Sequence, residues 1–234
     1  MNIAQTLAEN LANVSGRIAA AARQAGRSAD GITLVGVTKY VDAALARTLV
    51  AAGVHNLGES RPQQLWNKAA ELADEPVAWH LIGSLQRNKV RRTVEVAHLI
   101  HSLDSVRLAD AINDEAADLG RTVNVLLEVN ISGDATKHGM APGETLSLLN
   151  HVIELPHLRL RGLMTMSHRE GSPEIARRDF AALRELRDYL LSQAPRPTDL
   201  KELSMGMSDD FEQAILEGAT IVRIGSALFE GIES

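Results

Sequence analysis

The chain has 234 residues, of which 45% are hydrophobic and 23% are charged, and its formal net charge is −6. This apolar content excludes a mainly disordered protein. The absence of a long basic run, together with an aromatic content of only 3%, argues against a nucleic-acid-binding surface. Cysteine is absent, which excludes a disulfide framework, a thiolate nucleophile and a cysteine-ligated zinc site.

The first residues predict an amphipathic helix and not a signal peptide. Apolar residues recur at spacings of three and four from Ile3 to Ile18, and Gly26 can end the helix. A basic segment followed by an apolar run, as in a signal peptide, is missing. No apolar stretch approaches the roughly 20 residues that span a bilayer. We therefore expect a cytoplasmic protein that does not associate with membranes.

Short apolar runs alternate with helical patterns along the rest of the chain. The predicted strands are Ile32–Thr38, Val54–Glu59, Val77–Ser84, Leu99–Asp104, Val123–Ile131, Leu158–Met166, Glu202–Met207 and Ile221–Leu228. The predicted helices between them are Ala43–Ala52, Pro62–Ala73, Asn88–Val96, Ser105–Gly120, Glu144–Glu154, Pro173–Ser192 and Asp209–Gly218.

Strict alternation of strands and helices favours a parallel sheet with right-handed crossovers. Eight such units in about 200–250 residues fit a single α/β domain, a (β/α)₈ TIM-type barrel with an extra N-terminal helix, over residues 1–234. The N-terminal helix is expected to cover the face where an eighth trailing helix would lie. An open doubly wound sheet is the alternative, but no Gly-x-Gly-x-x-Gly motif follows the first strand.

Lys39 directly follows the first predicted strand, at the end of the barrel where active sites lie. If the lysine is desolvated there, burial would lower the pKa of its amine and so increase the neutral fraction. A neutral amine can form a Schiff base with an aldehyde. The alternative is a lysine at the rim with its ammonium group in solvent.

The seventh and eighth strands lead into loops that can hold an anion. Ser204 to Asp210 contains serines and Gly206 close to a predicted helix N-terminus, where backbone N–H groups favour anions. Arg223, Gly225 and Ser226 end the eighth strand, and glycine there allows close approach of the backbone. The alternative is that Ser208 or Asp209 only caps the helix.

A lysine after the first strand and an anion site after the last two indicate a phosphate-bearing aldehyde, and pyridoxal 5′-phosphate fits this description. Further motifs follow in order along the chain. They are Gly36-Val-Thr-Lys39, Gly58-Glu-Ser-Arg61, Trp79-His-Leu-Ile-Gly-Ser-Leu-Gln-Arg-Asn-Lys89, Ser102-Leu-Asp-Ser105, Glu128-Val-Asn-Ile-Ser132, Lys137-x-Gly139, Arg161-Gly-Leu-Met-Thr-Met166, Leu203-Ser-Met-Gly-Met-Ser-Asp-Asp210 and Val222-Arg-Ile-Gly-Ser226. With these motifs the chain resembles, from end to end, the pyridoxal phosphate homeostasis family, which is related to the barrel domain of alanine racemase.

The resemblance implies that Lys39 carries pyridoxal 5′-phosphate as an internal aldimine. It implies that Ser208, Gly225 and Ser226 hold the phosphate, with help from the backbone of Met207. It also places Arg223 at the pyridine nitrogen and adds Ser204 to the same pocket. The chain departs from the family pattern at Ser60, where asparagine is more common, so a polar contact from that loop to the cofactor is in doubt.

Arg223 also bears on catalysis. A cation beside the pyridine nitrogen disfavours its protonation, and an unprotonated ring is a poorer electron sink. In the related racemases a second base comes from an additional β-domain and a partner subunit, and we expect no such group here. The resemblance therefore implies a pyridoxal-phosphate-binding protein of vitamin B6 and amino-acid homeostasis, with little or no turnover.

We expect a monomer whose partners are pyridoxal 5′-phosphate and, as recipients, pyridoxal-phosphate-dependent apo-enzymes. One alternative is a racemase-like enzyme with an unusual second base. Another is an aldolase-like enzyme in which Lys39 reacts with a sugar phosphate.

Four other features of the sequence have simpler explanations than a role in chemistry. His80 lies inside a predicted strand and is expected to be a core histidine with satisfied hydrogen bonds. The histidine spacing matches no zinc motif, so we expect no metal site. Lys137 is expected to be a solvated loop lysine, with a second aldehyde-reactive amine as the alternative. Residues 86–92 form a small basic cluster that is expected to be a solvated face.

Overall fold

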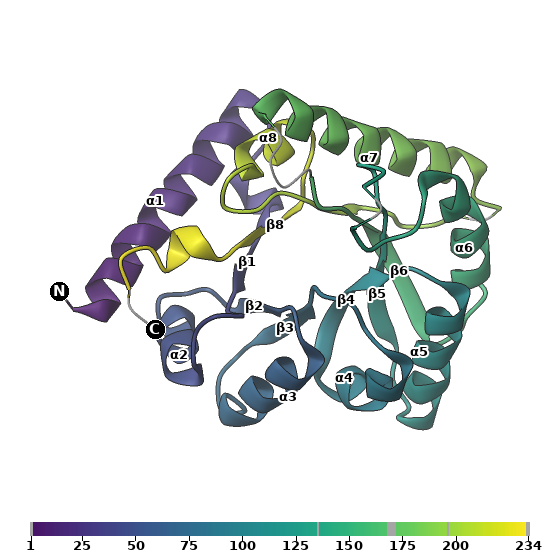
Figure 1. Cartoon of the computed structure of the whole chain (residues 1–234), viewed down its shortest axis with the longest axis horizontal. Helices are drawn as coiled ribbons and strands as arrows, with labels where there is room; N and C mark the ends of the chain where they lie inside the picture. The colour runs from purple at the N-terminus through teal and green to yellow at the C-terminus, as the bar shows by residue number, and fades with distance from the viewer. Residues whose placement is uncertain (1, 135, 168–171, 196, 233–234) are drawn as a thin grey trace.

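The computed structural model describes residues 2–134, 136–167, 172–195 and 197–232. Eight parallel strands, in chain order, close into a barrel (Figure 1). The strands are β1 (Thr33–Val37), β2 (Asn56–Glu59), β3 (Ala78–Leu81), β4 (Ala97–Leu103), β5 (Val123–Glu128), β6 (Leu158–Met164), β7 (Glu202–Ser204) and β8 (Ile221–Ile224). The barrel closes where β8 pairs with β1, with Thr33 opposite Ile221 and Gly36 opposite Ile224. The predicted (β/α)₈ barrel is confirmed.

The helices surround the barrel on the outside (Figure 1). They are α1 (Ile3–Gln24), α2 (Ala43–Ala51), α3 (Pro62–Glu71), α4 (Val90–Val96), α5 (Val106–Asp118), α6 (Thr145–Val152), α7 (Pro173–Gln193) and α8 (Phe211–Leu216), with 3₁₀ turns η1 (Ala29–Gly31), η2 (Arg87–Lys89), η3 (Pro142–Glu144) and η4 (Ser226–Leu228). Local signals explain several starts, because Asp42 caps α2 through the N–H of Leu45 and proline opens α3 and α7. Within the described part of the chain, no helix has the length and hydropathy needed to cross a membrane.

The N-terminal helix α1 fills the position beside β8, where the described residues contain only the short turn η4. Figure 1 shows α1 running along this side of the barrel next to α8 and the C-terminal segment. The Asn10 amide donates to the carbonyls of Leu228 and Glu230 at 3.1 and 2.9 Å. Arg17 pairs with Glu212 on α8 at 2.6 Å. The expected covering of this face by the N-terminal helix is thus confirmed.

The core has two layers, one between strands and helices and one inside the barrel. The inner apolar side chains are Val35, Ile82, Leu99, Leu126, Met164 and Ile221. Polar side chains share this interior, because His101 on β4 lies within hydrogen-bond distance of Ser204 on β7, and these strands are not neighbours in the sheet. The lumen is therefore a packed core that contains a set of internally paired polar groups.

Most predicted strands extend too far at their C-terminal ends. β5 ends at Glu128, after which Val129 makes only an isolated bridge to Met140. β8 ends at Ile224, and the rest of its predicted range forms η4. These loop residues are apolar because they pack against the core, so their composition resembles that of a strand. By contrast β4 is longer than predicted, starting at Ala97.

Asn10→Ala should lower the free energy of unfolding by about 1–2 kcal/mol, because it removes two hydrogen bonds between α1 and the C-terminal segment. Asn13→Ala is the matched control, since Asn13 is an exposed residue of the same helix and its replacement should change stability by a few tenths of a kcal/mol. Urea unfolding of both variants measures this, and equal effects would show that the contact does not stabilise the fold.

Candidate functional site

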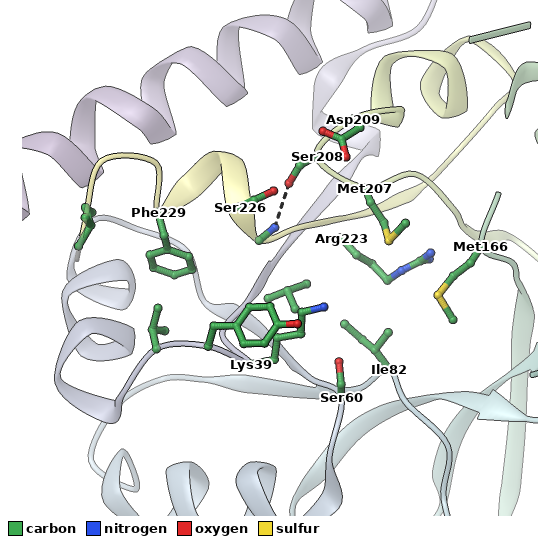
Figure 2. A pocket seen from close by; sticks show the side chains of 15 residues that line it. Lys39, Ser60, Ile82, Met166, Met207, Ser208, Asp209, Arg223, Ser226 and Phe229 are labelled. Atoms are coloured by element: carbon green, nitrogen blue, oxygen red, sulfur yellow. Dashed lines mark hydrogen bonds between the residues drawn. The ribbon is translucent and has the colours of Figure 1, made fainter. Parts of the chain in front are cut away.

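A pocket of about 460 Å³ opens at the C-terminal ends of the strands (Figure 2). Residues from β1 and β8, from the loops that follow these two strands, and from the loops that follow β2, β3, β6 and β7 meet there. The lining residues are Val37, Lys39, Tyr40, Val41, Ser60, Ile82, Met166, Met207, Ser208, Asp209, Arg223, Gly225, Ser226, Phe229 and Ile232. The walls combine apolar side chains with one amine, one guanidinium group, one carboxylate and three serine hydroxyls, which is the composition of a small-molecule site.

Lys39 enters the pocket from the loop after β1, and Figure 2 shows its amine on the side of Ser60 and Ile82. The strand ends at Val37, two residues before the lysine. Lys39 is therefore exposed, with its Nζ 4.7 Å from the centroid of the Tyr40 ring. Of the two alternatives, the structure shows the lysine at the rim and not a desolvated amine, although the amine does face the pocket.

A buried ion pair holds the backbone in front of Lys39. The Glu59 carboxylate, which is fully buried, accepts from Thr38 Oγ1 at 2.6 Å and from Lys68 Nζ at 2.5 Å. Lys68 also donates to the carbonyl oxygen of Thr38 at 2.5 Å. Because α3 brings Lys68 and β2 brings Glu59, two neighbouring elements fix Thr38, the residue that precedes Lys39.

At the opposite wall, Ser208 and Ser226 lie next to the backbone of Gly225 (Figure 2). The Ser208 hydroxyl accepts from the N–H groups of Gly225 and Ala227, both at 3.3 Å. It does not cap a helix, since α8 begins at Phe211 and is shorter than predicted. The loop after β7 is thus tied to the loop after β8, and hydroxyl and N–H donors are brought together as an anion would require.

Gly206 provides the turn from β7 toward this wall. Its φ of +92° is unfavourable for other residues, and a Cβ atom would lie 2.8 Å from the Cα of Phe211. The N–H group of Met207 donates to Asp210 Oδ1 at 2.6 Å. Met207 therefore lines the pocket with its side chain, while its backbone donor is already engaged.

Arg223 lies at the base of the pocket and is almost fully buried. Nη1 donates to Ser204 Oγ at 2.6 Å, and Nη2 donates to the carbonyl oxygen of Thr165 at 2.9 Å. Burial lowers the pKa of Arg223 to about 10, against the opposing effect of the Asp210 and Glu128 carboxylates. The guanidinium group is therefore still a cation at neutral pH, held rigidly beside the pocket.

The structure places six of the seven predicted site residues at the pocket lining and the seventh below it. Ser204 is fully buried and lines no part of the pocket. Its hydroxyl lies between Arg223 and His101, at 2.6 and 2.9 Å. The expectation that Ser204 joins the pocket wall is wrong, because the last residue of β7 points into the lumen and reaches the pocket only through Arg223.

Glu128, at the end of β5, has an unusual environment that the sequence analysis did not identify. Burial, with the Asp104 carboxylate as the second cause, raises the pKa of Glu128 to about 7, and Arg223 opposes this shift. In the sequence, the position of Glu128 at the end of a strand was the signal that could have identified it. Tyr40 was also missed as a lining residue.

Other sequence features have specific structural outcomes. His80 is a satisfied core histidine, as predicted, with contacts to Asn56 and His101. The Lys137 amine is held at 2.5 Å by the carbonyl oxygen of Ser167, so it is not a solvated loop lysine. Arg91, in the small basic cluster, pairs with Glu115 at 2.9 Å. Among the described residues no group of three potential metal ligands comes together.

The protein-family comparison matches residues 10–232 to the family described as "Alanine racemase, N-terminal domain". The chain is 44% identical to the pyridoxal phosphate homeostasis protein of Pseudomonas aeruginosa, over 96% of this chain and 95% of that protein. The chain belongs to the pyridoxal phosphate homeostasis protein family.

Solved structures agree with this assignment. PipY of Synechococcus elongatus, in a structure with bound PLP (pyridoxal 5′-phosphate), is 35% identical with a TM-score of 0.84, covering 95% of this chain and 99% of PipY. An alanine racemase of Clostridium difficile shares the fold, with a TM-score of 0.75 at 19% identity, covering 98% of this chain and 58% of the racemase. Members of the homeostasis family thus have the barrel of the racemases.

Because the pKa of Glu128 is raised to about 7 in the folded protein from its ordinary value of 4.5, folding should weaken as pH rises through this range. The folded state binds more protons than the unfolded state between these two values, so the free energy of unfolding falls. The loss between pH 5 and pH 7.5 should be on the order of 2–3 kcal/mol. Glu128→Gln should remove this part of the pH dependence.

Urea unfolding of the wild type and Glu128→Gln at both pH values measures the difference. Glu71→Gln, at an exposed glutamate of α3, is the control and should leave the pH dependence unchanged. If the free energies of unfolding of wild type and Glu128→Gln differ by the same amount at both pH values, the raised pKa of Glu128 is contradicted.

Proposed function

We propose that this protein binds pyridoxal 5′-phosphate through Lys39 and acts in pyridoxal phosphate and amino-acid homeostasis with little or no turnover. The observation that carries the proposal is one pocket with a lysine amine on one wall and serine hydroxyls beside a glycine backbone on another. The names of the homeostasis relatives and the PLP-bound PipY structure support it.

The residues of the pocket fit this cofactor. A cavity of about 460 Å³ is large enough for a single substituted ring, and Ile82 and Met166 supply apolar contacts for it. The hydroxyls of Ser208 and Ser226 would hold the phosphate, and the N–H of Gly225 would join them by giving up its 3.3 Å contact with Ser208. When bound, the cofactor supplies an aldehyde carbon and an electron-withdrawing ring.

Each group in the chain has a distinct role in this proposal. Lys39 would provide the amine to which the aldehyde carbon attaches, and its side chain is exposed at the pocket. Arg223 would supply a fixed cation, and a cation beside the ring nitrogen would disfavour protonation there. This weakens the electron sink, so proton removal from an attached amino acid is poorly supported.

The arrangement of candidate bases supports the same conclusion. Tyr40 lines the pocket but is next to Lys39 in the chain, with its ring against the lysine amine. It therefore shares the lysine's side and does not supply a base on the opposite side, as a two-base racemase needs. We propose further that the protein is a cytoplasmic monomer and that apo-enzymes are recipients of the cofactor.

Purified protein with added pyridoxal 5′-phosphate should absorb in the near-visible range, and borohydride should remove the band and leave a pyridoxyl group on the Lys39 peptide. Lys39→Ala should lose both signals with its circular-dichroism spectrum unchanged. Lys201→Ala is the control, since Lys201 is exposed and lies just before β7, at the other end of the strand from the pocket. A protein that stays colourless would favour the aldolase-like alternative, which needs no cofactor.

Turnover is tested separately in heavy water with alanine and other amino acids. We expect the loaded protein to exchange the α-hydrogen at least about a thousandfold more slowly than typical enzyme turnover of roughly 10 s⁻¹. Proton NMR of the α-hydrogen signal measures the rate. Exchange at an ordinary enzymatic rate would overturn the homeostasis role in favour of a racemase-like enzyme.

A further inference from the structure

A continuous chain of hydrogen bonds crosses the lumen of the barrel. It runs from Arg223 Nη1 to Ser204 Oγ at 2.6 Å and from Ser204 to His101 Nδ1 at 2.9 Å. It continues from His101 Nε2 to His80 Nδ1 at 2.9 Å and from His80 Nε2 to Asn56 Oδ1 at 3.1 Å. Five strands, β8, β7, β4, β3 and β2, contribute one residue each.

The groups at the two ends fix the donor-to-acceptor direction of every hydrogen bond between them. A guanidinium group can only donate, and the Asn56 carbonyl oxygen can only accept. Ser204 therefore accepts from Arg223 and donates to His101. Each neutral imidazole has one N–H, so both His101 and His80 carry their proton on Nε2.

Burial keeps both imidazoles neutral. It lowers the pKa of His80 to about 3, with His98 as a second cause. It also lowers the pKa of His101 well below its usual value, with His80 and Arg223 adding to the effect. At neutral pH the hydrogen-bond chain thus has one cation, Arg223, at the end next to the pocket. Aligned N–H and O–H dipoles make up the rest of it.

The lower end of the chain reaches a second opening of the barrel. Asn56 is the first residue of β2 and, with His80, lines a cavity of about 280 Å³ at the N-terminal ends of the strands. His98, Asn124 and Arg159 are among its other lining residues. The polar path therefore joins the cofactor side of the barrel to its opposite face.

We propose that Ser204, His101 and His80 are positioning residues that hold the Arg223 guanidinium toward the pocket and make it sensitive to charge in the lower cavity. This proposal depends on the proposed function only for the identity of the ligand that Arg223 faces in the pocket. In a protein interior of low dielectric constant, successive hydrogen bonds in a chain polarise one another. A negatively charged group that accepts a hydrogen bond from His80 Nε2 would strengthen each donor between His80 and the pocket. It would thereby draw the Arg223 N–H toward Ser204.

The tautomers can be tested without any cofactor. Nitrogen NMR of the ligand-free protein with ¹⁵N-labelled histidine at pH 7 should show His80 and His101 neutral and protonated on Nε2. Protonation of either ring on Nδ1, or a charged ring at either position, would overturn the one-directional chain.

The coupling is tested by Asn56→Asp, which adds a carboxylate at the position that accepts from His80 Nε2. Asn124→Asp is the matched control, because Asn124 lines the same cavity but donates to the carbonyl oxygen of His98 at 3.2 Å instead of joining the chain. Asn56→Asp should shift the His101 nitrogen resonances in the ligand-free protein and change the Kd for pyridoxal 5′-phosphate at least about threefold. Asn124→Asp should do neither.

Ser204→Ala distinguishes an effect of Asn56→Asp that travels along the hydrogen bonds from a local effect of that substitution, since it removes the link between His101 and Arg223. In this background Asn56→Asp should still shift the His101 resonances but should no longer change the Kd, and the double-mutant cycle gives the coupling. Equal effects of Asn56→Asp and Asn124→Asp, or an unchanged His101 in a folded Asn56→Asp protein, would overturn the proposal. If the wild type fails to bind pyridoxal 5′-phosphate, the proposed function fails, while the tautomers and the His101 response still decide whether the chain exists.

Discussion

The burial of the Arg223 guanidinium group is the constraint on which the interior of this barrel depends. Removing a cation from water costs several kcal/mol unless its donors are satisfied and opposite charges lie nearby. Ser204 and the carbonyl oxygen of Thr165 accept two of its N–H groups, while Glu128 and Asp210 act electrostatically. Since these groups come from β5, from β7 and from the loops after β6 and β7, the cation can be accommodated only after the barrel has closed.

The same requirement explains why the lumen is not uniformly apolar. Once the Ser204 hydroxyl accepts from Arg223, its own proton needs an acceptor, and His101 provides it. His101 then needs a partner, and so does His80, until the chain ends at Asn56 near solvent. Each polar group of this hydrogen-bond chain satisfies the one before it, which if left unsatisfied would cost about 1–3 kcal/mol.

The sequence predicted the barrel and the set of loops that form the pocket, because alternation and turn residues are local signals. It predicted polar lining residues such as Lys39 and Ser208 from their places after the strands, but not apolar ones such as Val37. It failed for Ser204, since the direction of a side chain at a strand end depends on the tilt of the closed barrel. It left the exposure of Lys39 open, because whether the lysine is buried depends on where the strand stops, which is at Val37.

The interior hydrogen-bond chain could not be found in the same way. His80, His101 and Ser204 are single polar residues in otherwise apolar strands, far apart in sequence. Their pairing requires the register of five strands and closure of the sheet, which no local pattern contains. The raised pKa of Glu128 has the same origin, since it results from burial and from Asp104 on the loop after a neighbouring strand.

The two cationic groups of the pocket are held in opposite ways, and this difference bears on the proposed role. Arg223 is rigid, with two hydrogen bonds under 3 Å, whereas the Lys39 side chain is exposed and only its preceding backbone is fixed. The loops after β7 and β8 are joined through Ser208 by two longer contacts of 3.3 Å. In the proposed function, a fixed floor would face the cofactor ring, while an exposed amine and these longer contacts at the rim would let the cofactor enter and leave. Efficient catalysis requires the reverse, an enclosed site with its reacting groups held in place, so this distribution of rigidity supports the proposed role in binding and release.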